Sequence, residues 1–133
     1  LRRRVHYIQD YDEVVSRALA YGSDIAINIP MVGLEACGTS WEKDIANLKL
    51  LISTADGGVA DVAPLACLQV TGRTDAATRE SVFQHMQQAA TLCRQPNDYA
   101  AAIRRQLTAY LPIISGARML RDYLQFIFPH QAA

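Results

Sequence analysis

The chain has 133 residues, 50% of them apolar, and a mean hydropathy of +0.02, a composition that can build a packed core and excludes a wholly disordered protein. Thirteen basic and thirteen acidic side chains cancel, so no net basic field favours nucleic acid or an anionic membrane as a partner. No apolar run approaches the ~20 residues that span a bilayer, and no apolar stretch near the start indicates a signal peptide.

The first elements predicted along the chain are a strand, a helix and a second strand. Residues 5–8 are β-branched and aromatic and indicate a short strand. Asp12 can cap the helix that follows, and Gly22 ends it. The apolar face of this helix would hold Val14, Val15, Ala18 and Leu19. Residues 25–29 form a nearly continuous apolar run closed by Pro30, which predicts a parallel strand covered on both faces.

The middle of the chain predicts a second helix and two more strands. A loop leads to a helix over residues 41–48, which Thr39 or Ser40 can cap. Residues 50–53 and 66–70 are short apolar runs that indicate further strands.

From residue 75 onward the pattern is helical to the end of the chain. Three helices are predicted in succession, over residues 76–94, over residues 99–111, and over a last segment that Ser115 caps and that reaches Phe128. Their limits are marked by three prolines, Pro96, Pro112 and Pro129.

Together these elements predict an α/β fold in a single, partial domain. Residues 1–74 would form a small, parallel, Rossmann-like sheet with its helices, and residues 75–133 a C-terminal helical segment. A parallel sheet of about three strands leaves unpaired edges and half-covered faces, so we expect it to belong to a larger sheet.

The loop before the second predicted helix lies at the carboxyl end of a strand, where open α/β sheets bind ligands. Backbone N–H groups beside Gly38, Thr39 and Ser40 could bind an anion such as a phosphate. Lys43, one turn into the helix, is one of only two lysines and could form a Schiff base with an aldehyde cofactor. A sequence of this kind more commonly forms a capped helix with a lysine on its surface.

The cysteines Cys37, Cys67 and Cys93 are odd in number and widely spaced. They fit neither a disulfide framework nor a zinc site, so no metal is predicted. We expect buried thiols in a cytoplasmic protein.

Residues 35–43, E-A-C-G-T-S-W-E-K, resemble the pyridoxal-phosphate motif of the glycogen and α-glucan phosphorylases, usually E-A-S-G-T-S/G-G/N-M-K. The likeness continues without a gap through Asp61 and is greatest to the shorter bacterial α-glucan phosphorylases. Residues 115–123, S-G-A-R-M-L-R-D-Y, resemble the family's terminal S-A-A-R-M-V-R-E-Y, whereas residues 62–95 are only loosely similar.

The resemblance implies a glycosyltransferase with two Rossmann-like domains of the GT-B type and the active site between them. Such enzymes move a glucosyl unit from the end of an α-1,4-glucan onto phosphate, giving glucose 1-phosphate. Cofactor binding would fall to Lys43, which holds pyridoxal phosphate, and to Thr39 and Gly38 near the cofactor phosphate. Glu35 would contact a sugar hydroxyl, and Cys37 and Gly38 would lie against the sugar and its phosphate.

Departures from the family pattern lie in the motif and just after it. Trp41 is bulky where the family keeps the backbone close to the cofactor, and Glu42 adds a negative charge that should repel it. Cys37 replaces a serine, and Leu48 replaces the glycine that follows Asn47. The family's N-terminal domain and the basic residues that hold substrate phosphate are missing, so we expect no phosphorolysis by this chain alone.

Two alternatives stay open beside the phosphorylase hypothesis: a degenerate, non-catalytic binding or assembly module, and a small Rossmann-like protein that resembles phosphorylases by accident. The partners implied by the resemblance are α-glucan, phosphate and the missing N-terminal domain. The family's last helix crosses back towards that domain, and alone it would expose an apolar stripe and self-associate. Residues of this apolar and aromatic kind more often belong to a core than to a cofactor site, and we expect this of Tyr110, Met119, Tyr123, Phe126 and Ile127.

Overall fold

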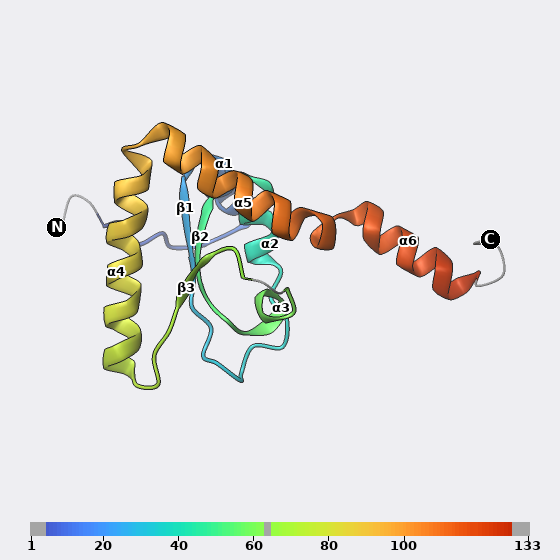
Figure 1. The fold of residues 1–133 in the computed structure, drawn as a ribbon, viewed down its shortest axis with the longest axis horizontal. Helices are drawn as coiled ribbons and strands as arrows, with labels where there is room; N and C mark the ends of the chain where they lie inside the picture. Colours follow the sequence, from blue (N-terminus) through green and yellow to red (C-terminus); the bar gives the residue numbers. More distant parts are fainter. Residues whose placement is uncertain (1–4, 63–64, 129–133) are drawn as a thin grey trace.

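The computed structural model describes residues 5–62 and 65–128, and a three-stranded parallel sheet lies at its centre (Figure 1). The strands lie in the order β1 (Ile25–Asn28), β2 (Leu50–Thr54) and β3 (Leu68–Val70). Helix α2 (Ser40–Ala46) connects β1 to β2, and the short helix α3 (Gly57–Ala60) lies between β2 and β3. The predicted α/β class with a small parallel sheet is confirmed.

The strand predicted at residues 5–8 is not formed. This segment has no regular structure, and its side chains Val5 and Tyr7 are exposed to solvent. Side chains of these types favour a strand only where a neighbouring strand offers hydrogen bonds and cover. The first strand of the sheet is therefore β1, and the two parallel connections run from β1 to β2 and from β2 to β3.

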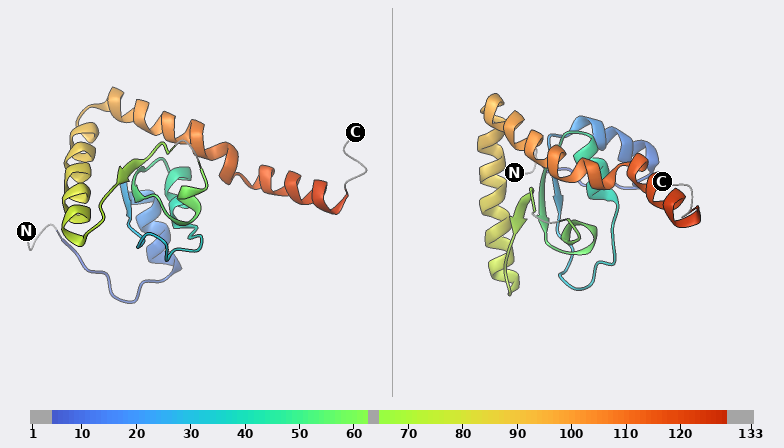
Figure 2. Two further views of the ribbon diagram at one scale, coloured as in Figure 1. Left: turned by 60° about the horizontal axis from the view of Figure 1, so that its bottom comes forward. Right: turned by 45° about the vertical axis from the view of Figure 1, so that its right-hand side comes forward.

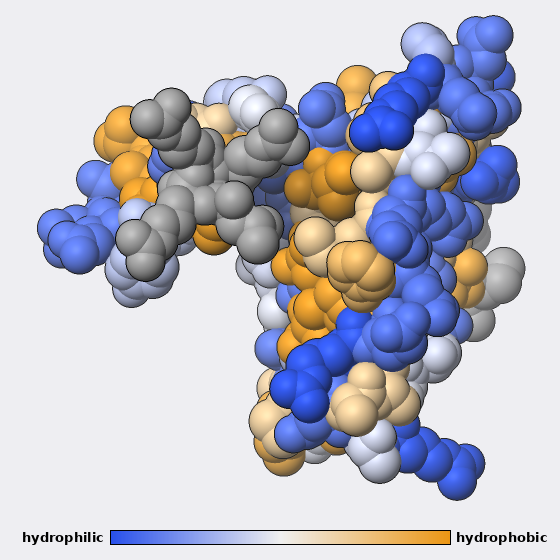
Figure 3. All heavy atoms as spheres, turned by 90° about the vertical axis from the view of Figure 1, so that its left-hand side faces the viewer, coloured by the Kyte–Doolittle hydropathy of each residue, from blue (hydrophilic) through white to orange (hydrophobic). Residues whose placement is uncertain are grey.

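The first helix and the first strand are both less covered than their apolar residues predict. Helix α1 (Glu13–Gly22) has the predicted bounds, and Asp12 Oδ1 caps it by accepting a hydrogen bond from Val15 N at 2.8 Å, but none of its residues is buried. In β1, Ala26 is buried, whereas Ile27 on the opposite face is 47% exposed, so the expected cover on both faces is wrong. Figure 3 shows apolar side chains exposed on the face of the molecule that carries α4 (Asp75–Cys93).

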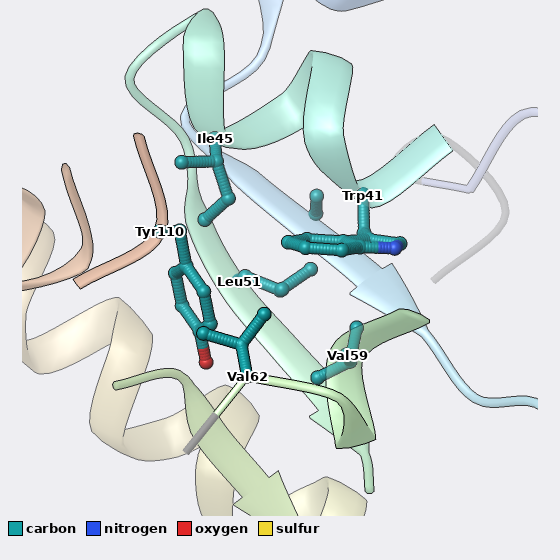
Figure 4. Close-up of a cluster of buried hydrophobic side chains, with 7 residues drawn as sticks. Trp41, Ile45, Leu51, Val59, Val62 and Tyr110 are labelled. Carbon is teal, nitrogen blue, oxygen red and sulfur yellow. The ribbon is translucent and has the colours of Figure 1, made fainter. Parts of the chain in front are cut away.

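Two clusters of buried apolar side chains lie on opposite faces of the sheet, and β2 contributes to both. Leu51 belongs to the first cluster, and Leu50 and Ile52 belong to the second, as the alternation of a strand requires. Helices α2 and α3 lie on one side of the sheet and α4 on the other (Figure 2), while α5 (Pro96–Ile114) contributes to both clusters. The first cluster (Figure 4) consists of Ala26, Trp41, Ile45, Leu51, Val59, Val62 and Tyr110.

The start of β2 is completed by a side chain. Strand β3 pairs with the second half of β2, beginning at Ile52, so it does not reach the first residues. The buried side chain of Gln106 lies there instead: its Oε1 accepts a hydrogen bond from Leu51 N at 2.9 Å, and its Nε2 donates one to Lys49 O at 2.8 Å. Each backbone group would cost about 1–3 kcal/mol if it were buried without a partner, so this amide ties α5 firmly to the sheet.

Helix α5 extends beyond its predicted limits of 99–111 at both ends. It begins at Pro96, because the first turn of a helix tolerates proline, whose missing N–H would have no partner there. It continues through Pro112 to Ile114, so the predicted interruption at Pro112 is wrong. A proline so close to the helix end removes one backbone hydrogen bond, and the helix stops two residues later.

Helix α6 (Gly116–Ile127) follows α5 and projects from the body of the molecule (Figure 1). Ser115 caps it as predicted, because Ser115 Oγ accepts a hydrogen bond from Arg118 N at 3.2 Å. No residue of α6 is buried, so the predicted exposure of an apolar stripe is confirmed. Core burial is confirmed for Tyr110 but is wrong for four residues of α6, namely Met119, Tyr123, Phe126 and Ile127.

The predicted end of this helix at Pro129 lies outside the described residues. Among the residues that the structure describes, no helix has the length and apolar character needed to cross a membrane.

Candidate functional site

Two loops at the carboxyl end of the sheet are held together by Asp56. One loop leaves β1 and enters α2, and Asp56 itself stands between β2 and α3. Asp56 Oδ2 accepts hydrogen bonds from Gly33 N at 2.9 Å and from Glu35 N at 3.1 Å. The bond from the Glu35 N–H, with further backbone donors, outweighs desolvation and holds the pKa of the Asp56 carboxyl below its usual value. Asp56 therefore fixes the loop that carries Glu35.

This role of Asp56 does not follow from the sequence pattern alone. The pattern does contain a signal, because a carboxylate stands just after a buried strand and before two glycines. Which loop it holds depends on the parallel pairing that places Asn28 of β1 beside Ser53 of β2.

The side chain of Glu35 lies over two glycines that have backbone conformations unfavourable for other residues. Gly38 has a φ of +65° and Gly57 a φ of +53°. A Cβ on Gly57 would lie 2.6 Å from Glu35 Cγ and 2.8 Å from Cys37 O, and one on Gly38 would lie 3.1 Å from Glu35 Oε1. Gly58 N also donates a hydrogen bond to Cys37 O at 3.1 Å. The structure thus brings Glu35, Cys37 and Gly38 together around Gly57.

Helix α2 separates a buried side from a solvent-exposed side. Trp41 and Ile45 point into the first core cluster. Thr39 and Lys43 are four residues apart, so they lie on the same side of the helix, and both are exposed. Thr39 precedes the first turn, but its side chain makes no capping hydrogen bond, so its hydroxyl is not committed to the helix end.

Lys43 lines a shallow groove of about 250 Å³ between α2 and α1. The groove is also lined by Glu13, Arg17 and Tyr21 of α1, and Arg17 Nη2 forms an ion pair with Glu13 Oε1 at 2.7 Å. Neither Thr39 nor any residue of the Glu35 cluster lines this groove.

The other lysine, Lys49, is in a different state. It is 5% exposed, and its Nζ lies 2.7 Å from Asp44 Oδ1. The pair closes the end of α2, where Leu48 N donates to Ile45 O and Lys49 N donates to Asp44 O. This is the Schellman pattern, in which the residue in the position of Leu48 adopts a left-handed conformation. Leu48 has a φ of +63°, so the glycine that the resemblance leads one to expect there would fit without strain.

Trp41 does not occupy the side of α2 that carries Lys43. It is 2% exposed, and its ring meets Tyr110 edge-on at 5.5 Å between ring centroids (Figure 4). Its Nε1 points away from Tyr110 and has no hydrogen-bond partner. The bulk of Trp41 therefore fills the core, while Glu42 is half-buried.

A second cavity, of about 460 Å³, lies at the same end of the sheet. It is bounded by the ends of the three strands and the start of α4, and its lining includes Met31, Thr54 and Arg73 but no motif residue from 35 to 43. Within residues 5–62 and 65–128, no group of three or more His, Cys, Asp or Glu side chains is arranged to hold a metal ion.

The cysteines differ from one another in exposure. Cys37 and Cys93 are exposed, so the expectation of buried thiols is wrong for both. Cys67 is half-buried, and burial raises the pKa of its thiol. Its backbone N–H and that of Ala66 both donate to the hydroxyl of Tyr110, at 3.2 and 2.9 Å.

Comparison with known proteins finds similarity to glycogen phosphorylases. The chain is 26% identical over 153 aligned positions to glycogen phosphorylase of Mycobacterium tuberculosis, covering 96% of this chain and 17% of that protein. It is 25% identical over 134 positions to glycogen phosphorylase of Aquifex aeolicus, covering 91% of this chain and 19% of that protein. The chain thus spans less than a fifth of the length of these curated relatives. No protein-family model and no solved structure matches it.

Proposed function

This chain is a distant homologue, over nearly its whole length, of one segment of the glycogen phosphorylases, and on that premise we propose that it is the C-terminal part of an α-glucan phosphorylase. The complete enzyme would transfer a glucosyl unit from an α-1,4-glucan to phosphate. This chain would contribute one wall of the active-site cleft and the attachment point of pyridoxal phosphate. The likeness of the relatives also favours a cytoplasmic location.

The observation that carries the proposal is the cluster of Glu35, Cys37 and Gly38 around Gly57. It lies at the carboxyl ends of β1 and β2, which is where open α/β sheets bind their ligands. A carboxylate such as that of Glu35 is suited to accept hydrogen bonds from sugar hydroxyls. Asp56 supports this role, because its bond to Glu35 N fixes the loop before a ligand arrives and so reduces the ordering cost of binding.

The residues on the exposed side of α2 fit attachment of the cofactor. Lys43 offers an exposed amine for covalent attachment of the aldehyde, and the uncommitted hydroxyl of Thr39, one turn earlier, can bind the cofactor phosphate, with Gly38 beside it. When bound, pyridoxal phosphate would supply its phosphate group for proton transfer. The open groove leaves the site accessible to water, so we expect weak binding by this chain alone.

The proposed activity requires a second wall. Part of a cleft cannot exclude water or hold both glucan and phosphate in a reactive geometry. The partner that completes the site would be a protein carrying the N-terminal domain of a phosphorylase. The isolated chain is expected to release no glucose 1-phosphate from glucan and phosphate, and release by the purified chain would contradict this expectation.

The experiment that tests cofactor attachment is borohydride reduction in the presence of pyridoxal phosphate, followed by peptide mass mapping. A specific adduct is expected on Lys43. Lys49 is an internal control, because its amine is buried in an ion pair with Asp44. Lys43→Arg keeps the charge and should abolish the specific adduct. An adduct on Lys49 instead of Lys43 would refute the assigned site.

A second candidate is a degenerate, non-catalytic binding or assembly module. It is favoured by the lining of the groove beside Lys43, which includes no residue of the Glu35 cluster. This candidate predicts that neither lysine acquires a specific adduct and that borohydride trapping gives the same low background in wild type and Lys43→Arg.

A further inference from the structure

Trp41 carries a hydrogen-bond donor that has no partner in the described part of the chain. Its side chain is 2% exposed, and no atom of the described residues accepts a hydrogen bond from its Nε1. Burial of an unpaired donor costs free energy, because water satisfies the same group in the unfolded chain. The nitrogen points away from Tyr110 (Figure 4), so the donor lies at the edge of the first core cluster.

The thiol of Cys37 lies beside this donor. Both groups are neighbours of Gly58, because a Cβ on that glycine would lie 3.2 Å from Trp41 Nε1 and 3.5 Å from Cys37 Sγ. Gly58 N also donates a hydrogen bond to Cys37 O at 3.1 Å, which holds the backbone of the two segments together. A thiol sulfur is only a weak acceptor, so an oxygen attached to this sulfur would be a much better partner for the indole N–H.

We propose that Cys37 is a site of reversible oxidation by hydroperoxides, and that the indole N–H of Trp41 stabilises the sulfenic acid formed there. The Cys37 thiolate attacks one peroxide oxygen, so that an S–O bond forms as the O–O bond breaks. The sulfur loses two electrons and the peroxide gains them, and the other oxygen leaves as hydroxide and takes up a proton to become water. The new oxygen on sulfur accepts the hydrogen bond from Trp41 Nε1, and this bond favours the oxidised state because the thiol cannot form its equal.

The three cysteines differ in their suitability for this reaction. Cys37 is exposed, so a small peroxide can reach it. Cys67 is half-buried, and burial raises the pKa of its thiol and so lowers the fraction of reactive thiolate. Cys93 is exposed, but partial desolvation and the negative charge of Asp24 raise the pKa of its thiol as well. Cys93 is therefore a control for exposure, and it has no indole beside it.

The product at Cys37 is expected to remain a sulfenic acid within one chain. A sulfenic acid condenses with a nearby thiol to form a disulfide. The backbone N–H of Cys67 donates to the hydroxyl of Tyr110, and the indole nitrogen of Trp41 points away from that ring (Figure 4). Cys67 is thus placed on the other side of Trp41 from the proposed site.

The first test is chemical trapping in the full chain. The reduced chain is treated with one equivalent of hydrogen peroxide, dimedone is added after increasing delays, and labelled peptides are mapped by mass. Label on Cys37 should exceed label on Cys93 at least tenfold. Trp41→Phe keeps an aromatic ring in the core but removes the donor, and it should shorten the lifetime of the sulfenic acid at Cys37 by about two- to tenfold, the effect of one hydrogen bond.

The second test needs no substitution in the core. Trp41 is the only tryptophan, so its fluorescence reports on this site alone. Peroxide should shift the Trp41 emission of wild type, and Cys37→Ala should abolish the shift, whereas Cys93→Ala should retain it. Dithiothreitol should reverse the shift, because its thiol attacks the oxidised sulfur, displaces water, and then releases Cys37 as its own two sulfurs form a disulfide.

Three outcomes would overturn the inference: equal labelling of Cys37 and Cys93, an unchanged lifetime of the sulfenic acid in folded Trp41→Phe, or a Trp41 emission that oxidation leaves unaltered. The emission test decides the matter where Trp41→Phe does not fold. The inference does not rest on the proposed function. Its failure is distinguishable from failure of that function, because these experiments contain no pyridoxal phosphate and do not involve Lys43.

Discussion

Strand β2 and helix α6 are both rich in apolar residues, but every residue of β2 is buried and none of α6 is. Strand β2 lies between two strands, and helices pack on both of its faces. Helix α6 extends from the end of α5 without such layers (Figure 1). The difference shows that apolar residues indicate a need for cover, whereas the topology decides whether that cover comes from within the chain.

The largest difference in free energy of unfolding is expected when one leucine in β2 and one leucine in α6 are each replaced by alanine. Leu51→Ala removes a fully buried side chain from β2 and should lower the free energy of unfolding by about 2–5 kcal/mol, because it leaves a cavity. Leu124→Ala in α6 should change it by less than about 0.5 kcal/mol. Urea unfolding, followed by Trp41 fluorescence at a concentration where the chain is monomeric, gives both values. Equal losses would break the comparison.

The same contrast between buried and exposed sites should hold for hydroxyl groups on α5. Tyr110→Phe leaves the N–H groups of Ala66 and Cys67 without their acceptor and should cost about 1–3 kcal/mol. Tyr99→Phe removes an exposed hydroxyl that donates to Asp24 O, and since water can replace it, the cost should stay below about 1 kcal/mol. Thermal unfolding of the two variants side by side tests the order, and a larger loss for Tyr99→Phe would contradict it.

Backbone conformation is expected to affect stability even where a side chain is exposed. Leu48 is 54% exposed and has a φ of +63°, so its side chain contributes little burial while its backbone is strained. Leu48→Gly should therefore raise the free energy of unfolding by up to about 1 kcal/mol. Leu48→Ala retains the strain and serves as the control. Greater stabilisation by alanine than by glycine in urea unfolding would disprove this explanation.

The smallest effect concerns the motif loop, which hydrogen bonds hold without apolar burial. The pKa of Asp56 is lowered in the folded chain, so its stabilising effect is present above the ordinary carboxyl pKa of about 3.9 and is lost as pH falls through the lower, folded value. Hydrogen exchange at the amides of Gly33 and Glu35 should accelerate at neutral pH in Asp56→Ala, which removes the acceptor of both bonds, while the amide of Leu51 in β2 keeps its protection. Unchanged exchange at Glu35 would show that Asp56 does not hold the loop.

Much of the helical structure could be predicted because helix limits depend on neighbouring residues. Asp12 and Ser115 cap α1 and α6 as their sequence positions indicate, and the limits of α4 lie within one residue of the prediction. The strand at residues 5–8 and the break at Pro112 were wrong for a common reason. At residues 5–8 the local preference for a strand was not realised, because the long-range contacts of a neighbouring strand were absent. At Pro112 the local preference for a break was overcome by long-range contacts that were present.

The residues of the candidate site could be identified from the sequence, but their grouping could not. The motif points to Glu35, Cys37 and Gly38, and the parallel sheet places them around Gly57. Lys43 follows from the same motif, but its surroundings depend on how α1 packs beside α2. Asp56 was not predicted as the anchor of this loop, because its partners stand more than twenty positions away in the chain.

By itself, the sequence determined the α/β class, most helix limits and the relationship to a segment of the phosphorylases, because these depend on local periodicity, on capping residues and on a contiguous motif. Only the tertiary structure decided which apolar residues are covered, and it turned Trp41 inward and left α6 bare. It also placed Gln106, more than fifty positions away in the chain, where its side-chain amide completes the hydrogen bonds at the start of β2. Burial and hydrogen-bond satisfaction depend on neighbours in space, and a linear pattern does not specify those neighbours.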